Sequence, residues 1–283
     1  MNTHSIHSIL SVLSVIFPLF PLFPLSAFAQ SPVITRATSL AIGHTRQQDT
    51  YLSPLDFSGT QLSYLKESQR PVTLWHTPFQ RQSFFQLNLS TTESPAGNSD
   101  YLGGLLRYDA TWFSTLCSAR SDAPRLENPQ PSALNLSLGP QLGGTLGTLY
   151  HTRNGNNPAQ LIAEAHLAVS AQAALPFRLW KRHFVLRDQM DIPLLGAMFS
   201  PNYGQSYYEL FSLGHTDHNV CITHPFNAPS LRNRLTLDFR IGRQTFRAGY
   251  LLDVRQSHVN DLRRHDITHA FLIGWVRQIT FIH

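Results

Sequence analysis

The sequence predicts an all-β protein: a single antiparallel transmembrane β-barrel of about 12 strands, with 10 and 14 as alternatives. Apolar and polar residues alternate with period two along most of the chain. The clearest alternating segments run for about ten residues or more, which suits a tilted membrane-spanning strand of about 9–11 residues better than a soluble strand of about 5–6. Beyond the first segment, no apolar stretch approaches the roughly 18 residues of a membrane helix.

The composition excludes other classes of protein. Only 14% of the 283 residues are charged, against about 25% in an average soluble domain. With a mean hydropathy of −0.15, the chain is neither a bundle of membrane helices nor a typical disordered chain. The net charge of +5 comes without a basic stripe, so nucleic acid is not expected as a partner.

Residues 1–29 are predicted to be a cleaved signal peptide. They contain no Asp, Glu, Lys or Arg, and their apolar run ends in a small-x-small sequence that predicts cleavage after Ala29. An N-terminal membrane anchor is the alternative, but three prolines interrupt the apolar run and oppose a straight helix. Residues 30–283 are then expected to form a single exported barrel domain.

Eleven segments carry the strand pattern, separated by stretches rich in Gly, Pro, Asn and Asp. Segment 159–175 also has features of a helix, because Asn157-Pro158 suits a helix start and alanine favours helices. Nine matched alternations favour a strand there. The expected strands are 38–46, 59–68, 83–90, 102–113, 134–150, 159–175, 184–194, 206–214, 235–241, 245–255 and 269–283.

The most specific structural prediction is a hairpin around Gly242. Glycine at the first central position suits a type II′ turn, and this turn fixes the register of the two strands. One face of the hairpin is then apolar, while the other carries a cross-strand ion pair. The expected pairs are Leu235 with Tyr250, Leu237 with Ala248, Phe239 with Phe246, and Asp238 with Arg247.

The apolar strand faces are expected to contact lipid, with the polar faces in the lumen. Tyr108 and Trp112 lie near the end of one apolar face, as in an interfacial girdle, and Phe281 fits the near-terminal aromatic of a closing strand, although Ile282 and His283 follow it. We expect long loops outside and tight turns in the periplasm. The lumen should be largely filled by side chains and hold a lattice of ion pairs. The charged residues expected in it are Arg107, Asp109, Arg187, Asp191, Asp238, Arg240, Arg247, Asp253 and Arg255.

Five blocks of sequence stand out: DTYLSPL (49–55), YHTRNGNNPA (150–159), FSPNYGQSYYE (199–209), HVN (258–260) and THAF (268–271). Together they resemble a family of exported proteins of unknown function from Gram-negative bacteria of the Bacteroidetes type. The resemblance covers most of the mature chain and implies an outer-membrane β-barrel. It supplies no catalytic or binding residues.

Few residues suggest chemistry. The segment from His215 to His224 holds His, Asp and Cys at a spacing that zinc or copper could use, but a polar surface loop is the simpler interpretation in a chain with 14 His. Cys117 and Cys221 could pair near one rim in an oxidising compartment, or remain two isolated thiols. The glycine-rich run 143–147 lacks the lysine of a phosphate loop, and we expect it to relieve crowding in a curved strand. No metal and no cofactor are predicted.

The predicted function is that of a non-enzymatic outer-membrane protein, either a narrow passive channel or a structural or surface-interaction barrel. One alternative is an outer-membrane lipid hydrolase that uses serine and histidine, for example Ser206 and His269, although no Gly-x-Ser-x-Gly motif is present. A soluble periplasmic β-protein is another. The expected partners are outer-membrane lipid and the barrel-insertion machinery, with small solutes possible, after export through the general secretory pathway. No catalytic residue is predicted.

Overall fold

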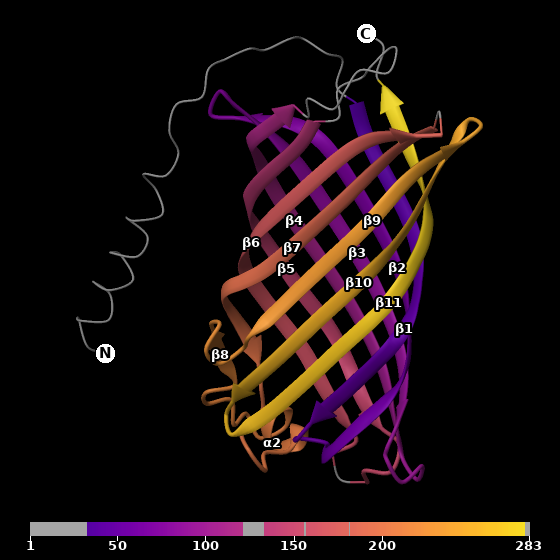
Figure 1. Cartoon of the computed structure of the whole chain (residues 1–283). Coiled ribbons are helices and arrows are strands. Elements are labelled where there is room, and N and C mark those ends of the chain that lie inside the picture. Colours follow the sequence, from indigo (N-terminus) through magenta and orange to yellow (C-terminus); the bar gives the residue numbers. More distant parts are fainter. Residues whose placement is uncertain (1–32, 121–132, 156, 181, 281–283) are drawn as a thin grey trace. The chain divides into compact units, whose positions relative to one another are not determined.

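A computed structural model describes residues 33–120, 133–155, 157–180 and 182–280, and this part of the chain forms a closed antiparallel barrel (Figure 1). Ten strands pair in sequence, apart from β7 pairing directly with β9, and the β1–β11 pairing closes the circle. The cleavage predicted after Ala29 and the aromatic Phe281 lie outside the described residues. The strands are β1 (Val33–Asp49), β2 (Ser53–Leu74), β3 (Thr77–Glu93), β4 (Asp100–Arg120), β5 (Ala133–His151), β6 (Ala159–Leu179), β7 (Arg182–Phe199), β9 (Ser230–Ile241), β10 (Gln244–Val259) and β11 (Leu262–Thr280).

A further short strand, β8 (Val220–Thr223), and a helix, α2 (Tyr207–Phe211), lie between β7 and β9. Strand β8 pairs with the end of β7 that β9 does not reach. In the described part of the chain, no helix has the length and apolar character needed to cross a membrane.

The expected number of about 12 strands was too high, and the alternative of ten matches the barrel. Ten of the eleven expected segments are barrel strands, including 159–175, which lies within β6. The prediction of a strand over 206–214 was wrong, because Ser206 begins α2. The Ser206 hydroxyl accepts a hydrogen bond from the Glu209 backbone N–H, and the Glu209 carboxylate accepts one from the Ser206 N–H. This reciprocal capping starts a helix turn that the S-x-x-E sequence could have predicted.

The alternation of side chains places polar residues inside the barrel and apolar residues outside. On β1, Ser39, Thr45 and Gln47 are buried, whereas Leu40 and Ile42 are 59% and 58% exposed. The same inversion holds around the wall, where many leucines are exposed while arginines and aspartates are buried. A soluble barrel would bury its large apolar side chains, so this pattern fits a wall surrounded by lipid.

The hairpin of β9 and β10 has the predicted register. Phe239 lies opposite Phe246, and Asp238 lies opposite Arg247. The Arg247 Nε donates to Asp238 Oδ1 over 2.6 Å. Gly242 has a φ of +61°, which the first position of a type II′ turn requires. The prediction is therefore confirmed down to individual pairs.

The strands are strongly tilted (Figure 1). The stagger of the strands can be counted by moving from each residue to the residue directly opposite it on the next strand. One full circuit of the barrel starts at Leu161 of β6 and returns to Ala173 of the same strand, a displacement of 12 residues. Such a stagger over ten strands corresponds to a tilt of about 35–45°. The interior of a barrel of this size is narrow enough for long side chains from opposite walls to meet.

The two ends of the barrel differ. The end that carries Val33 and Thr280, here called the terminal end, also has tight turns at Trp75, Trp180 and Gly242 (Figure 1). The opposite end, here called the distal end, carries residues 94–99, 152–155, 157–158 and 200–229, with α2 and β8. Tight turns also occur at the distal end, for example at 260–261. Long loops and tight turns are thus only partly segregated.

Candidate functional site

A network of ion pairs fills the lumen. Among the described residues, seven arginines and seven carboxylates take part, so the interior is electrically balanced. All project from inward-facing strand positions. The members are Arg107, Arg187, Arg232, Arg234, Arg247, Arg255, Arg264, Glu67, Asp109, Glu164, Asp191, Asp238, Asp253 and Asp266.

Arg232 lies at the centre of this network and is 1% exposed. Its guanidinium donates to Asp191 Oδ2 over 3.1 and 3.2 Å and also to Asp109, which lies on the opposite wall. Asp109 accepts a second hydrogen bond from Arg107 Nε at 2.9 Å. The Arg232 guanidinium also lies 4.6 Å from the centre of the Phe84 ring. Strands β3, β4, β7 and β9 are therefore joined across the lumen by one side chain.

Toward the terminal end, Glu67 organises the network. Its Oε2 accepts from Arg247 Nη1 at 3.2 Å and from Arg234 Nη1 at 3.3 Å. Asp238 then binds Arg247 in a bidentate pair, the geometry that gives arginine–carboxylate contacts their strength. Arg234 also lies 4.0 Å from Asp191, which links this group to the centre.

Toward the distal end, two more arginine–carboxylate contacts continue the network. Arg255 donates to Asp266, and Arg264 donates to Glu164. Asp253 lies 3.9 Å from both Arg107 and Arg255, and it therefore joins the Arg255–Asp266 contact to the centre. The network therefore spans the middle of the barrel from one half to the other.

Neutral side chains fill the space between the charges. Gln82 and Gln189 exchange two amide hydrogen bonds across the lumen, at 3.0 and 2.9 Å. A Cβ at Gly143 would lie 2.0 Å from Asp109 Oδ1 and 2.5 Å from His166 Nε2. Only glycine fits there, so the expectation that this glycine-rich run relieves crowding is confirmed at Gly143.

An aromatic and aliphatic cluster closes the distal part of the lumen. Phe57 and Tyr101 are fully buried, and their rings stack with centroids 3.7 Å apart. Leu105, Leu149 and Ile162 pack in the same cluster. On the distal side of the ion pairs, the lumen is therefore filled by apolar side chains.

Between this cluster and the distal end, tyrosine side chains connect the sequence blocks that carry the family resemblance. The blocks at 49–55, 150–159, 199–209 and 258–260 all lie at the distal end. The Tyr51 hydroxyl donates to the Gln205 carbonyl at 3.0 Å, and the Tyr207 hydroxyl donates to Gln160 Oε1 at 2.9 Å. The Tyr51 and Tyr207 rings meet edge to face at 5.7 Å. The blocks thus form one assembled surface, here called the distal cap.

Asparagines complete the distal cap. Asn154 Nδ2 donates to the Leu52 carbonyl at 3.2 Å. Asn260 Nδ2 donates to the Ser200 carbonyl at 3.1 Å, so the β10–β11 turn holds the start of the 200–229 segment. The fifth block lies in β11, where Thr268 contacts Thr45 at 2.9 Å inside the lumen.

Asp49 carries a buried carboxyl group in the distal cap. On β1, outward-facing Arg46 ends the apolar outer surface, and Asp49 lies beyond it toward the distal end. It is 3% exposed and accepts a hydrogen bond from the Tyr51 backbone N–H at 3.0 Å. Burial raises the pKa of Asp49 to about 6, against the opposing influence of the Arg264 guanidinium. This carboxyl group therefore changes its charge near neutral pH.

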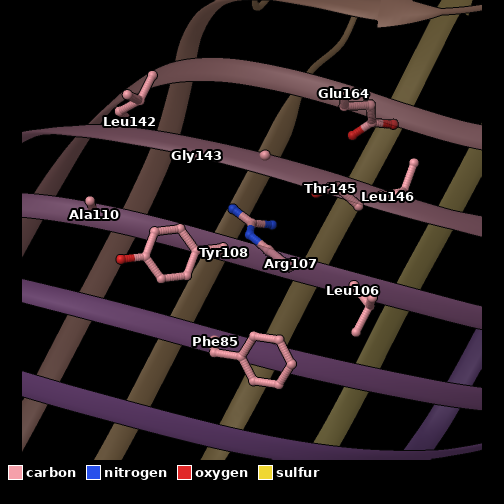
Figure 2. Close-up of a pocket in the computed structure, with 11 residues that line it drawn as sticks. Phe85, Leu106, Arg107, Tyr108, Ala110, Leu142, Gly143, Thr145, Leu146 and Glu164 are labelled. Atoms are coloured by element: carbon pink, nitrogen blue, oxygen red, sulfur yellow. The ribbon is translucent and has the colours of Figure 1, made fainter.

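The cavities found within the lumen are small. One of about 20 Å³ lies beside Glu67 and one of about 40 Å³ beside Glu164, each large enough for a few water molecules at most. A depression of about 500 Å³ lies on the outside of β3, β4 and β5, and Phe85, Tyr108 and Leu142 are among the residues that line it (Figure 2). Its outward-facing lining residues are apolar, and the inward-facing Arg107 and Glu164 lie behind them.

The sequence-based candidates for chemistry are dispersed. Among the described residues, no three His, Cys, Asp or Glu side chains are grouped to hold a metal, including those of 215–224. Cys117 and Cys221 are both free. The expectation that they lie near one rim was wrong, because Cys117 is near the terminal end of β4 and Cys221 is on β8 at the distal end.

Ser206 and His269 are not brought together. The Ser206 hydroxyl donates to Glu209 at the start of α2. His269 lies on the outer face of β11, where its Nδ1 is 2.5 Å from the Tyr250 hydroxyl. The hydrogen bonds of this serine therefore provide no histidine base.

The expected lattice of ion pairs is present, and eight of its nine expected members belong to it. Arg240 does not, because it donates to the Gly242 carbonyl at the terminal end. Sequence reasoning missed Arg232 and Arg234, although both continue the even-numbered polar face of the 235–241 segment. The expected strand starts at Leu235, the first residue of the clear alternation, whereas the observed strand β9 begins at Ser230. The other members missed were Glu67, Glu164, Arg264 and Asp266.

Comparisons with solved structures find matches of low sequence identity. The transport unit of the autotransporter AIDA-I from Escherichia coli has a TM-score of 0.42 at 9% identity, covering 95% of this chain and 97% of that one. An outer-membrane channel from Pseudomonas putida F1 has a TM-score of 0.36 at 10% identity, covering 92% and 100%. The translocator domain of the autotransporter NalP from Neisseria meningitidis has a TM-score of 0.32 at 9% identity, covering 96% and 95%.

No curated protein matches the chain. A family model described as "Protein of unknown function (DUF3316)" matches residues 10–283, almost the whole sequence. The five resembling blocks all lie within this match. The chain belongs to the DUF3316 family of proteins of unknown function.

Proposed function

We propose that this protein is an integral outer-membrane β-barrel with a closed lumen, which interacts with its surroundings through the distal cap and the outer wall. The observation that carries the proposal is the balanced network around Arg232 together with the cluster around Phe57 and Tyr101. These side chains fill the space that a solute would need. In this proposal the barrel is not an enzyme and acts as a structural or surface-interaction protein.

The apolar outer wall supports the membrane location, since exposed residues such as Leu40 and Ile42 would be unfavourable in the aqueous periplasm. We place the distal cap outside the cell and the terminal end in the periplasm, because the longest connection, 200–229, is distal. The proposed setting is the outer membrane of a Gram-negative bacterium of the Bacteroidetes type. Export through the general secretory pathway and insertion by the barrel-insertion machinery belong to this proposal.

A narrow channel for small solutes is the second candidate. It is favoured by the small cavities beside Glu67 and Glu164 and by N–H groups of Arg187 and Arg255 that lack a hydrogen-bond partner in the described structure. Water could bind these groups, and a rearranged network could then open a path.

Conductance in planar bilayers separates the two candidates. The closed-lumen proposal expects no stable conductance steps from the wild-type protein and discrete steps from a variant with Arg232, Asp109 and Asp191 all changed to Ala. Ohmic conductance of the wild type would contradict the closed lumen and support the channel. A faster-migrating unboiled band on a denaturing gel confirms that each sample is a folded barrel. If the triple variant fails this control, Gln82→Ala with Gln189→Ala offers a milder opening of the same lumen.

Cell fractionation tests the membrane location itself. We expect the protein in the outer-membrane fraction after washing with salt and carbonate. Release of the whole population into the wash would support a soluble periplasmic protein.

A further inference from the structure

Five cationic side chains gather on the outer face of four neighbouring strands near the terminal end. Two pairs lie directly opposite each other across strand pairs: Arg36 with Arg277, and Arg70 with Arg81. Lys66 lies on the same outer face of β2, two positions on the distal side of Ser68, which pairs with Arg36. We call these five residues the basic girdle. Like charges placed directly opposite on neighbouring strands destabilise a sheet, so this arrangement needs a compensating partner.

No carboxylate in the described chain neutralises the basic girdle. None of the five side chains makes an ion pair with a described residue. The neighbouring carboxylate of Glu67 points into the lumen, where Arg247 and Arg234 bind it. The distal half of the wall differs, because outward-facing Arg46 there pairs with Asp56 at 3.2 Å. The two opposed arginine pairs of the girdle have no such carboxylate partner among the described residues.

The girdle interrupts the apolar surface of the wall near the terminal end, with outward-facing Ile34, Val72 and Phe79 beyond it. On β1, outward-facing Arg36 is followed toward the distal end by Thr38 and the exposed Leu40 and Ile42. On β11, Arg277 follows the exposed Trp275, and Arg81 lies 5.8 Å from the ring of Trp112. Tryptophans beside cations at the edge of an apolar surface mark the depth of lipid head groups.

The opposite wall has no such opposed pairs. Its described arginines near the terminal end lie at the hairpin turns, and strand pairing places none of them directly opposite another: Arg178 lies opposite His183, Arg182 opposite Leu179, and Arg240 opposite Thr245. Directly opposed arginines at the terminal end are therefore found, among the described residues, on the side formed by β11, β1, β2 and β3.

We propose that the basic girdle binds the phosphate groups of anionic phospholipids in the leaflet at the terminal end of the barrel. A phosphate has oxygens enough to accept hydrogen bonds from two guanidinium groups at once, and its charge removes their mutual repulsion. Clusters of Lys and Arg at the membrane surface attract anionic lipids in this way. The inference depends on the proposed membrane insertion, and it is independent of whether the lumen is closed.

Lipid retention measured by native mass spectrometry tests the proposal directly. The full-length barrel is purified in a neutral detergent and titrated separately with phosphatidylglycerol, cardiolipin, lipid A and phosphatidylcholine. Arg36→Gln with Arg277→Gln, and Arg70→Gln with Arg81→Gln, should weaken the binding of phosphatidylglycerol and cardiolipin by about fivefold for each cation removed. Binding of phosphatidylcholine should not change. Arg46→Gln with Arg263→Gln, two outward-facing arginines of the distal half, is the matched control and should retain wild-type affinity.

Denaturant unfolding gives a second readout, in which the sign of the effect depends on the lipid. In phosphatidylcholine vesicles, the girdle variants should unfold at the same or a higher denaturant concentration than the wild type, because repulsion has been removed. In phosphatidylglycerol vesicles, they should unfold at a lower concentration. A purely structural role of these arginines would lower the midpoint in both lipids and would contradict the proposal.

The other outcomes are equally informative. Equal retention of phosphatidylglycerol and phosphatidylcholine by the wild type would overturn the proposal, as would binding of lipid A alone. So would an equal loss of binding in the distal control. A protein that inserts into neither kind of vesicle would instead refute the proposed membrane function.

Discussion

Replacing Arg232 by Met removes the central cation of the lumen while keeping an unbranched side chain. Asp109 would retain Arg107 at 2.9 Å, whereas Asp191 would keep only Arg234 at 4.0 Å as a cation. Ser170 and Gln189 would still donate neutral hydrogen bonds to Asp191, at 2.5 and 2.9 Å. Both carboxylates are at most 1% exposed, so water cannot readily replace the lost guanidinium.

The expected cost follows from this geometry. Breaking a buried ion pair by removing one partner typically costs about 3–5 kcal/mol, because the remaining charge is left uncompensated. Since each carboxylate keeps other donors, we expect Arg232→Met to lower the free energy of unfolding by about 3 kcal/mol. Arg46→Met is the matched control. The Arg46–Asp56 pair is exposed, with 62% and 53% of the two side chains accessible, and such pairs contribute about 1 kcal/mol or less.

Equilibrium unfolding in urea, in vesicles of one lipid composition at fixed pH, measures both variants. The heat-dependent shift on a denaturing gel reports the folded fraction independently. A loss in Arg232→Met no larger than that in Arg46→Met would refute the view that Arg232 holds the lumen together. A gain in stability would mean that the desolvation of the charges outweighs their attraction.

Three further predictions concern the distal cap, the lumen and the predicted signal peptide. Burial raises the pKa of Asp49 in the folded state from 3.8 to about 6, so the free energy of unfolding should fall by about 3 kcal/mol as the pH rises from about 4 to 7. Asp49→Asn should abolish this pH dependence in urea titrations. An unchanged pH profile in this variant would contradict the assignment of the pH dependence to Asp49. Gly143→Ala places a Cβ 2.0 Å from Asp109 Oδ1 and should cost about 1–3 kcal/mol in the same assay, whereas Gly155→Ala, with no heavy atom within 4 Å of its Cβ, should be neutral. The mass of the exported protein should correspond to cleavage after Ala29, and an uncleaved chain in the membrane would favour an N-terminal anchor.

The sequence was most informative where one strand face meets a uniform environment. In the proposed membrane setting lipid surrounds the wall. Outward positions such as Leu235, Leu237 and Phe239 are apolar, and their period two identifies the strand. The turn at Gly242 then fixes the neighbouring strand, because a two-residue hairpin leaves no freedom of register. These local rules explain why the ten barrel strands could be located before the structure was known.

The failures have physical causes as well. The segment 206–214 has apolar residues that fit a short strand, but the capping contact between Ser206 and Glu209 favours a helix. The partners of Arg232 could not be predicted, because Asp109 is 123 residues away and reaches it across the lumen. Local alternation shows that a residue faces inward, but it does not show which residue on the opposite wall faces it.

The distribution of charge connects the lumen to the outer wall. The seven arginines and seven carboxylates of the lumen cancel, so the chain's net charge of +5 belongs to its outer wall, ends and connections. Uncompensated charge inside the lumen would oppose folding and attract ions, whereas outside it can meet a charged partner at the membrane surface. The like-charge pairs Arg36–Arg277 and Arg70–Arg81 account for much of the excess on the wall. The same reasoning that explains a closed, neutral interior therefore predicts that the exterior is stabilised by an anionic lipid at the terminal end.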